Sequence, residues 1–271
     1  MTSRVPLRVS VAGLGAVGRT VTTALDAGLP GFQLAAVSVR RPERSADFLD
    51  GLSNPTRVLP LSELADVSDI VVECAPAAVF AELARPVVAA GKDLVVLSSG
   101  ALLDHWDLVD EAERTGARIR VPSGALLALD AVQAAALGSI SSVSMVTRKP
   151  LAGLEGAPYL AERGVDLAQV TEPHRLFSGT ARQAAKAFPA NLNVAVALSL
   201  AGTGPDRTRL EVWADPTVTR NTHRVVVESD SARLDFTIEN IPTDNAATGR
   251  ITALSVLALL RKMTASLQIG T

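Results

Sequence analysis

The glycine-rich segment at residues 13–18, GLGAVG, constrains the fold of this chain more than any other feature. It directly follows the apolar run 7–12 (LRVSVA) and opens a stretch with helical character. A strand, a glycine loop and a helix in this order are typical of a dinucleotide-binding βαβ unit. We expect Gly13 to allow the tight turn, Gly15 to let the backbone approach a pyrophosphate, and Gly18 to permit close packing of helix on strand.

The start of the helix after this loop completes the expected phosphate site. The first N–H groups of a helix lack intrahelical partners, and the positive end of the helix dipole favours an anion there. We therefore predict that the loop and the first helical residues bind the cofactor: Gly13, Gly15, Ala16, Val17 and Gly18. The alternative is an ordinary strand-to-helix turn that holds no ligand.

The end of the second predicted strand, at 33–39, bears on the choice of cofactor. In NAD-binding proteins an acidic residue there binds the ribose 2′-hydroxyl. Here the position holds Ser38, with Arg40 and Arg41 close behind. No carboxylate is present to repel a 2′-phosphate and two cations are near, so we predict that these three residues bind NADP or NAD, with NADP favoured. Alternatively, the two arginines belong to a solvated loop.

Strands and helices alternate through the first 122 residues. The segments with strand character are 7–12, 33–39, 69–75, 93–100 and 117–121, and helical segments lie at 78–91 and about 104–115. This alternation predicts βαβ units and a parallel sheet. The fold class is therefore α/β, with an N-terminal Rossmann-type sheet as a dinucleotide-binding domain over residues 1–122.

After Pro122 the pattern changes to that of a second, α+β domain over 123–245. It contains a predicted strand at 141–150, a helix at 190–201 and an irregular stretch at 151–172, which we extend through His174. Three alternating runs at 208–216, 222–229 and 232–240 predict antiparallel strands. We expect the last segment, 246–271, to form a helix that packs back on the first domain.

The composition excludes several classes of function. The chain has 271 residues and a formal net charge of −2, which gives no reason to expect nucleic acid or an anionic membrane as partner. The single cysteine, Cys74, excludes an intrachain disulfide and a cysteine-based metal site. We expect no metal, no membrane span, a cytoplasmic location, and a homodimer or higher homo-oligomer.

Histidine is the usual group for proton transfer near neutral pH, and the chain has only three. His105 lies in DHWDL within the first domain. His174 lies in EPHRL, in the stretch we expect to be irregular, and His223 lies between two predicted strands of the second domain. Position alone does not distinguish them, because a lone histidine is more often structural or exposed than catalytic.

Several segments, spread in order over nearly the whole chain, resemble the L-aspartate dehydrogenase family. They are GLGAVG (13–18), VVECAP (71–76), LVVLSSGAL (94–102), PSGALLALDAV (122–132), TRKP (147–150), FPANLNVAVALSLAGTGPDRTRLEVWADP (188–216), NTH (221–223) and NIPTDNAATGRITALSVLALL (240–260). The Pro-x-Asn-x-Asn-Val-Ala stretch, with a downstream Asp-Pro and Asn-x-His, is quite specific. One departure is that members often carry Asn-Pro-Lys-Thr where this chain has Asn-Ala-Ala-Thr at 245–248.

The resemblance implies a Rossmann domain followed by an α+β substrate domain. It implies that His223 is the general acid/base and that Ala125 and Asn193 contact the nicotinamide end of the cofactor. The implied reaction is the oxidation of L-aspartate to iminoaspartate with NADP or NAD, or the reverse amination of oxaloacetate with ammonia. The partners are thus small molecules.

A dicarboxylate substrate needs cationic or amide partners in the second domain. We predict that Arg148, Lys149 and Asn191 bind it; the alternative for the first two is a solvent-facing pair. Two other functions stay open. One is a different oxidoreductase of the same architecture, of dihydrodipicolinate-reductase or homoserine-dehydrogenase type. The other is a non-catalytic NAD(P)-binding regulatory protein, which would need the glycine loop but not His223.

Overall fold

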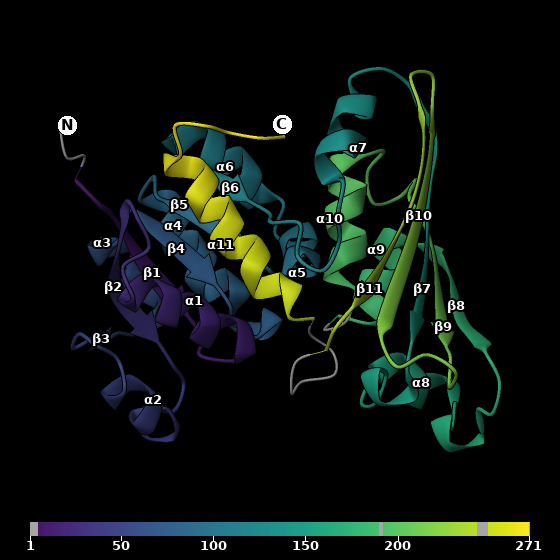
Figure 1. The fold of residues 1–271 in the computed structure, drawn as a ribbon, viewed down its shortest axis with the longest axis horizontal. Helices are drawn as coiled ribbons and strands as arrows, with labels where there is room; N and C mark the ends of the chain where they lie inside the picture. The colour runs from purple at the N-terminus through teal and green to yellow at the C-terminus, as the bar shows by residue number, and fades with distance from the viewer. Residues whose placement is uncertain (1–4, 190–191, 243–248, 271) are drawn as a thin grey trace. The chain divides into compact units, whose positions relative to one another are not determined.

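The structure is a computed structural model, which describes residues 5–189, 192–242 and 249–270. The chain divides into two compact units (Figure 1). Unit 1 comprises Met1–Pro122 and Ala253–Gln268, and unit 2 comprises Ser123–Thr252 and Ile269–Thr271. We describe each unit by itself.

The described residues of unit 1 form a six-stranded sheet in the order β3-β2-β1-β4-β5-β6. Its strands are β1 (Leu7–Ala12), β2 (Phe32–Ser38), β3 (Arg57–Val58), β4 (Ile70–Glu73), β5 (Asp93–Val96) and β6 (Ile119–Arg120). Every pairing is parallel, so the predicted Rossmann-type sheet is confirmed. The short strand β3 is absent from the sequence prediction, because two residues show no periodicity.

Helices connect and cover these strands. They are α1 (Ala16–Asp26), α2 (Ala46–Asp50), α3 (Leu64–Val67), α4 (Phe80–Ala89), α5 (Ser99–Asp104), α6 (Asp107–Thr115) and α11 (Ile251–Thr264). Although α11 comes last in the chain, its Val256 and Leu260 are fully buried in the same apolar cluster as Val9 and Val11 of β1. The core consists largely of aliphatic side chains, which suits a sheet covered on both faces.

The described residues of unit 2 form a five-stranded mixed sheet in the order β11-β10-β7-β9-β8. The strands are β7 (Ile140–Lys149), β8 (His174–Thr180), β9 (Arg209–Ala214), β10 (Asn221–Ser229) and β11 (Arg233–Asn240), and the helices are α7 (Leu129–Ala136), α8 (Pro158–Arg163), α9 (Ala181–Ala187) and α10 (Asn193–Ala201). The predicted second α+β unit is therefore present.

The order of the strands in this sheet goes beyond what the sequence predicted. The three runs expected as antiparallel strands are β9, β10 and β11, and of these β10 and β11 pair with each other. The long strand β7 lies between β10 and β9, antiparallel to the first and parallel to the second. Strand β8, which begins at His174 in the segment expected to be irregular, completes the sheet. Alternation identifies strands but not their neighbours, which depend on long-range pairing.

One face of this sheet carries the core of unit 2. Buried residues alternate along β7 at Val143, Met145, Thr147 and Lys149. The apolar members of this row join one cluster with helix residues such as Leu198 of α10. Because the row runs to the end of β7, the same helix-covered face also carries two polar groups, a threonine hydroxyl and a lysine ammonium.

Candidate active site

The glycine loop has the geometry that its sequence predicts. Gly13 has φ +96°, a left-handed conformation, and a Cβ added there would lie 2.5 Å from the carbonyl oxygen of Cys74. A Cβ at Gly18 would overlap the carbonyl oxygen of Gly13. Both positions therefore require glycine for the backbone itself to pack, whether or not a ligand is present.

Gly15 differs from its two neighbours in the motif. A Cβ built on it meets no atom within 4 Å, so the fold alone does not demand glycine there. Gly15 is the N-cap of α1, no side chain caps the helix, and its first turn holds no acidic residue. The open space at Gly15 and the uncapped helix start fit a phosphate that approaches the backbone closely.

The end of β2 lies directly beside this loop. The N–H of Gly13 donates to the carbonyl oxygen of Ser38 at 2.8 Å. The side chain of Ser38 is buried, whereas Arg40 and Arg41 are exposed. Of the residues predicted to select the cofactor, the two arginines are thus free to reach a ligand beside the loop.

A buried carboxylate organises the neighbouring strand ends. Glu73, the last residue of β4, accepts hydrogen bonds at Oε2 from the backbone N–H groups of Leu97 and Ser98, at 3.0 and 2.7 Å, and at Oε1 from the Ser98 hydroxyl at 3.0 Å. Burial raises the pKa of Glu73, while these hydrogen bonds counteract the shift. Glu73 therefore fixes the segment after β5 at the carboxyl edge of the sheet, where ligands bind in folds of this type.

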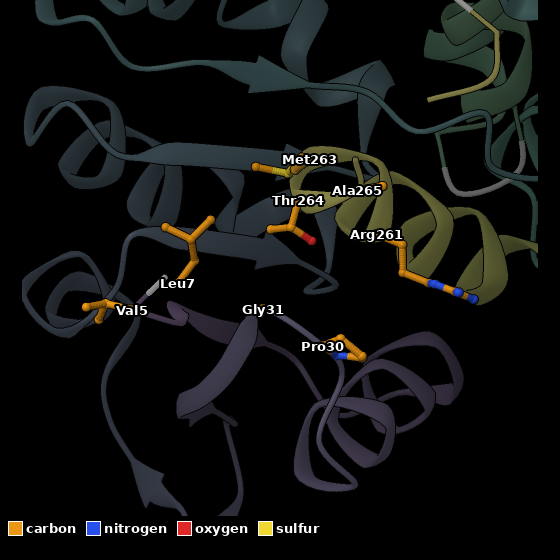
Figure 2. Close-up of a pocket in the computed structure, with 8 residues that line it drawn as sticks. All are labelled: Val5, Leu7, Pro30, Gly31, Arg261, Met263, Thr264 and Ala265. Carbon is orange, nitrogen blue, oxygen red and sulfur yellow. The ribbon is translucent and has the colours of Figure 1, made fainter. Parts of the chain in front are cut away.

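A separate surface pocket of unit 1 lies away from that edge (Figure 2). It is lined by Val5, Leu7, Pro30, Gly31, Arg261, Met263, Thr264 and Ala265. Leu7 begins β1 and Gly31 precedes β2, so the pocket is at the amino ends of the strands. The glycine loop follows the carboxyl end of β1, and this pocket is consequently not the dinucleotide site.

The most distinctive polar contact of unit 2 joins His223 of β10 to Thr147 of β7. The two residues are opposite each other in the antiparallel ladder, and Thr147 Oγ1 lies 2.7 Å from His223 Nδ1. Both side chains are buried. Burial, together with the positive charge of Lys149, lowers the pKa of His223 to about 3, so that its imidazole is neutral at neutral pH.

Lys149 lies on the same face, two residues beyond Thr147 on β7. Its side chain is only 2% exposed, and burial lowers its pKa to about 8. Across the described part of the chain, its ammonium has no hydrogen-bond or ion-pair partner. A buried ammonium without a partner is costly, so this group is suited to a ligand that brings a negative charge.

Arg148 projects from the opposite face of β7 because side chains alternate along a strand. It forms a 3.0 Å ion pair with Asp215 and stacks 4.9 Å from the ring centre of Trp213. The structure thus separates the two residues that we predict to bind substrate: Lys149 shares a face with His223, whereas Arg148 is paired on the other face.

The loop that contains Ala125 is held by a residue at the end of β11. Asn240, the last residue of β11, donates from Nδ2 to the carbonyl oxygen of Ala125 at 2.9 Å. Gly124 and Ala128 both have positive φ, at +62° and +56°. A non-glycine residue in this conformation is unusual, and Ala128 immediately precedes α7. Asn240 thereby fixes the backbone of Ala125.

The remaining candidates lie elsewhere. Asn193 is the first residue of α10, and Asn191 is outside the described residues, as are 245–248. His105 directly follows α5 and stacks on Phe80 in unit 1, and His174 is exposed at the start of β8. Of the three histidines, only His223 is buried beside a polar partner.

Sequence reasoning did not identify Thr147 or Asn240 as site residues. Both lie in segments that resemble the family, but the role of each depends on a partner far away in the sequence, His223 for Thr147 and Ala125 for Asn240. Glu73 is visible in the sequence at the end of a predicted strand, but not its hydrogen bonds. Within the described ranges, no group of three or more His, Cys, Asp or Glu is arranged to hold a metal, and no helix has the length and apolar character to cross a bilayer.

Comparison with known proteins covers both units. Residues 130–263 match the family described as aspartate dehydrogenase, C-terminal, and residues 13–122 match the homoserine dehydrogenase NAD-binding domain. An L-aspartate dehydrogenase from Bradyrhizobium diazoefficiens is 58% identical over 265 residues, which cover 98% of this chain and 94% of that protein. One from Methanocella arvoryzae is 40% identical over 270 residues, 97% and 99% of the two chains.

Solved structures agree on the fold. Aspartate dehydrogenase from Thermotoga maritima superposes with a TM-score of 0.73 over 97% of this chain and 99% of that one, at 22% identity. The Rossmann sheet and its glycine loop, with the matched nicotinamide-cofactor domain, define an oxidoreductase that uses NAD or NADP and acts on a CH–NH₂ group. Within that class, the chain belongs to the L-aspartate dehydrogenase family.

Proposed function

We propose that this protein oxidises L-aspartate to iminoaspartate with NADP or NAD, or catalyses the reverse amination of oxaloacetate with ammonia. The two relatives compared above are named L-aspartate dehydrogenase, and this chain matches 94% and 99% of their lengths. The observation that carries the proposal is the pair His223 and Lys149, a buried neutral imidazole and a buried ammonium on one face of the second sheet.

The cofactor would be held by the loop that Gly13, Gly15 and Gly18 form and by the first turn of α1, which includes Ala16 and Val17. Open space at Gly15 and the uncapped helix support this assignment. Arg40 and Arg41, exposed beside the loop, would favour a 2′-phosphate. Ala125 and Asn193 would contact the nicotinamide end, a role that rests on the family resemblance. A cofactor bound there would supply the acceptor for a hydride that leaves the substrate Cα.

The protein's own residues handle charge and protons. The amino group of aspartate must lose a proton before its lone pair can assist departure of hydride from Cα. His223 would accept that proton, and because Thr147 occupies Nδ1, the exchange would use Nε2. For Nε2 to accept a proton, Nδ1 must carry the hydrogen of the neutral ring and donate it to Thr147 Oγ1, and this hydrogen bond persists when the ring becomes protonated.

Lys149 would bind a substrate carboxylate. Of the three residues expected to bind substrate, its position supports the role directly, because it shares the face of His223. Arg148 is paired with Asp215 on the opposite face, so its contribution would be to hold the end of β7. For Asn191 the role remains a prediction.

A turnover assay tests this proposal. Reduction of NADP⁺ and NAD⁺ is followed by absorbance with L-aspartate, L-homoserine or no substrate. Reduction that depends on L-aspartate supports the proposal. Turnover of homoserine alone would favour the homoserine-dehydrogenase alternative, and cofactor binding without any turnover would favour a regulatory protein. The cytoplasmic location and the homo-oligomeric state remain predictions.

A further inference from the structure

His223 and Lys149 lie on neighbouring strands and face the same way. His223 is opposite Thr147 across the β10–β7 ladder, and Lys149 is two residues further along β7. Both side chains are buried, 3% and 2% exposed. A charge on either group is therefore poorly screened by water, and the two positive forms disfavour each other.

The other groups around His223 do not offset this effect. On β11 the residue in register with His223 is the apolar Ile238, and Glu239 beside it points to the other face, towards Arg220. Asp215 at the end of β9 is held by Arg148 and Thr217. Among the charged groups of the described residues, only Lys149 affects the pKa of His223, and it lowers it.

In this state the imidazole is too weak a base for the proposed reaction. A base with a pKa of about 3 takes very little of the proton of an ammonium group. The unliganded site thus holds one buried positive charge, that of Lys149, and resists a second. A ligand carboxylate paired with Lys149 would neutralise the charge of the ammonium. His223 could then take up one proton, and the net charge of the site would be no higher than in the unliganded protein.

We propose that a carboxylate of the substrate, by pairing with Lys149, converts His223 from an inert buried imidazole into the proton acceptor of the reaction. The proton leaves the ammonium nitrogen of the bound amino acid as its N–H bond breaks, and an N–H bond forms at His223 Nε2. No oxidant or metal takes part in this step. The inference rests on the proposed function and adds that an anionic substrate activates its own base.

The experiment is an NMR titration of the histidine Cε1–H signals in the full protein with saturating NADP⁺. The chain has only three histidines, and His105→Gln and His174→Gln assign their signals. Succinate serves as the probe, because it is a dicarboxylate without an amino group to oxidise. Without succinate, we expect the His223 signal not to titrate above pH 5. With saturating succinate, the His223 signal should titrate above pH 5, which from a pKa of about 3 is a rise of at least about two units, or roughly a hundredfold gain in proton affinity.

Variants of Lys149 test whether the effect of succinate on the pKa of His223 depends on the charge of this lysine. In Lys149→Met, the His223 pKa should already be higher without ligand, and succinate should add little. Lys149→Arg keeps the charge and should keep the succinate effect, as should Lys186→Met, which removes an exposed lysine of α9 in the same unit.

Three results would overturn the inference: a His223 pKa that bound succinate leaves unchanged, an equal rise in Lys149→Met, or no binding of succinate to the wild-type protein. Turnover of L-aspartate is measured separately. Turnover with no succinate effect refutes the inference alone, whereas a succinate effect without turnover refutes the proposed function alone.

Discussion

Thr147 Oγ1 lies 2.7 Å from His223 Nδ1, between two strands that pair antiparallel at this position. The contact fixes which ring nitrogen is available, because Nδ1 is taken and Nε2 remains for a substrate. It also orients a ring that would otherwise rotate within an apolar core.

Removal of this hydroxyl should impair turnover more than folding. Thr147→Val keeps the branched shape and deletes the partner of Nδ1, so we expect kcat to fall about tenfold or more, within the range that positioned acid/base groups contribute. Thr147→Ser keeps the hydroxyl and should retain most activity. Steady-state kinetics with L-aspartate make the comparison, and equal kcat for both variants would contradict an orienting role.

Substitutions of the loop glycines should have two different effects, on cofactor affinity or on thermal stability. Gly15→Val should weaken cofactor binding strongly and leave the melting temperature nearly unchanged, because a Cβ there meets no protein atom. Gly18→Ala should lower the melting temperature, since its Cβ would overlap the Gly13 carbonyl. Fluorescence titration and thermal unfolding measure the two effects. Unchanged affinity in Gly15→Val would remove the phosphate-loop assignment.

The cofactor preference should follow the arginines after β2. We expect kcat/KM with NADP to equal or exceed that with NAD, because no carboxylate lies at Ser38 and Arg40 and Arg41 are exposed beside the loop. The double variant Arg40→Ala with Arg41→Ala should lose efficiency with NADP more than with NAD. A strong NAD preference that the double variant leaves unaltered would contradict this.

The buried charge of Lys149 should lower the free energy of unfolding at neutral pH, compared with a protein that has an uncharged side chain at this position. Its pKa is lowered from 10.5 to about 8 by burial, which corresponds to roughly 3 kcal/mol of unfavourable burial when the group is charged. This cost is present below pH 8. It disappears as pH rises from 8 to 10.5, because the folded protein releases the proton before the unfolded chain does.

Lys149→Met should therefore raise the free energy of unfolding at pH 7 by a few kcal/mol, at a loss of activity. The difference between variant and wild type should shrink towards pH 10.5. Denaturant unfolding at several pH values measures it. A Lys149→Met protein that is less stable than wild type at pH 7 would show that an unseen partner already pairs with the ammonium.

The sequence predicted the first unit better than the second. In unit 1 the periodicities and the glycine loop are local, and consecutive strands of a Rossmann sheet have few possible arrangements. In unit 2, β8 was not recognised. The position of β7 between β10 and β9 could not be predicted either, because it depends on contacts far apart in the sequence.

In the candidate site, too, local features could be predicted from the sequence and long-range contacts could not. The tight turn at Gly13 and the close packing at Gly18 were predicted from the sequence, since each depends on the local backbone, whereas a phosphate at Gly15 stays a prediction. His223 was one of three equivalent histidines until the family resemblance singled it out. The environment of His223 was not visible, because Thr147 and Lys149 are brought to it by strand register, and that register also places Arg148 on the other face.

The most direct test of the account is the kcat of His223→Ala with L-aspartate and saturating NADP⁺. Loss of the acid/base should reduce kcat by about 10²–10⁴-fold, while cofactor affinity stays near that of the wild type because the glycine loop belongs to the other unit. His105→Ala and His174→Ala should lose far less. A near-normal kcat in His223→Ala, or equal losses in all three variants with matching drops in melting temperature, would contradict the assignment of His223.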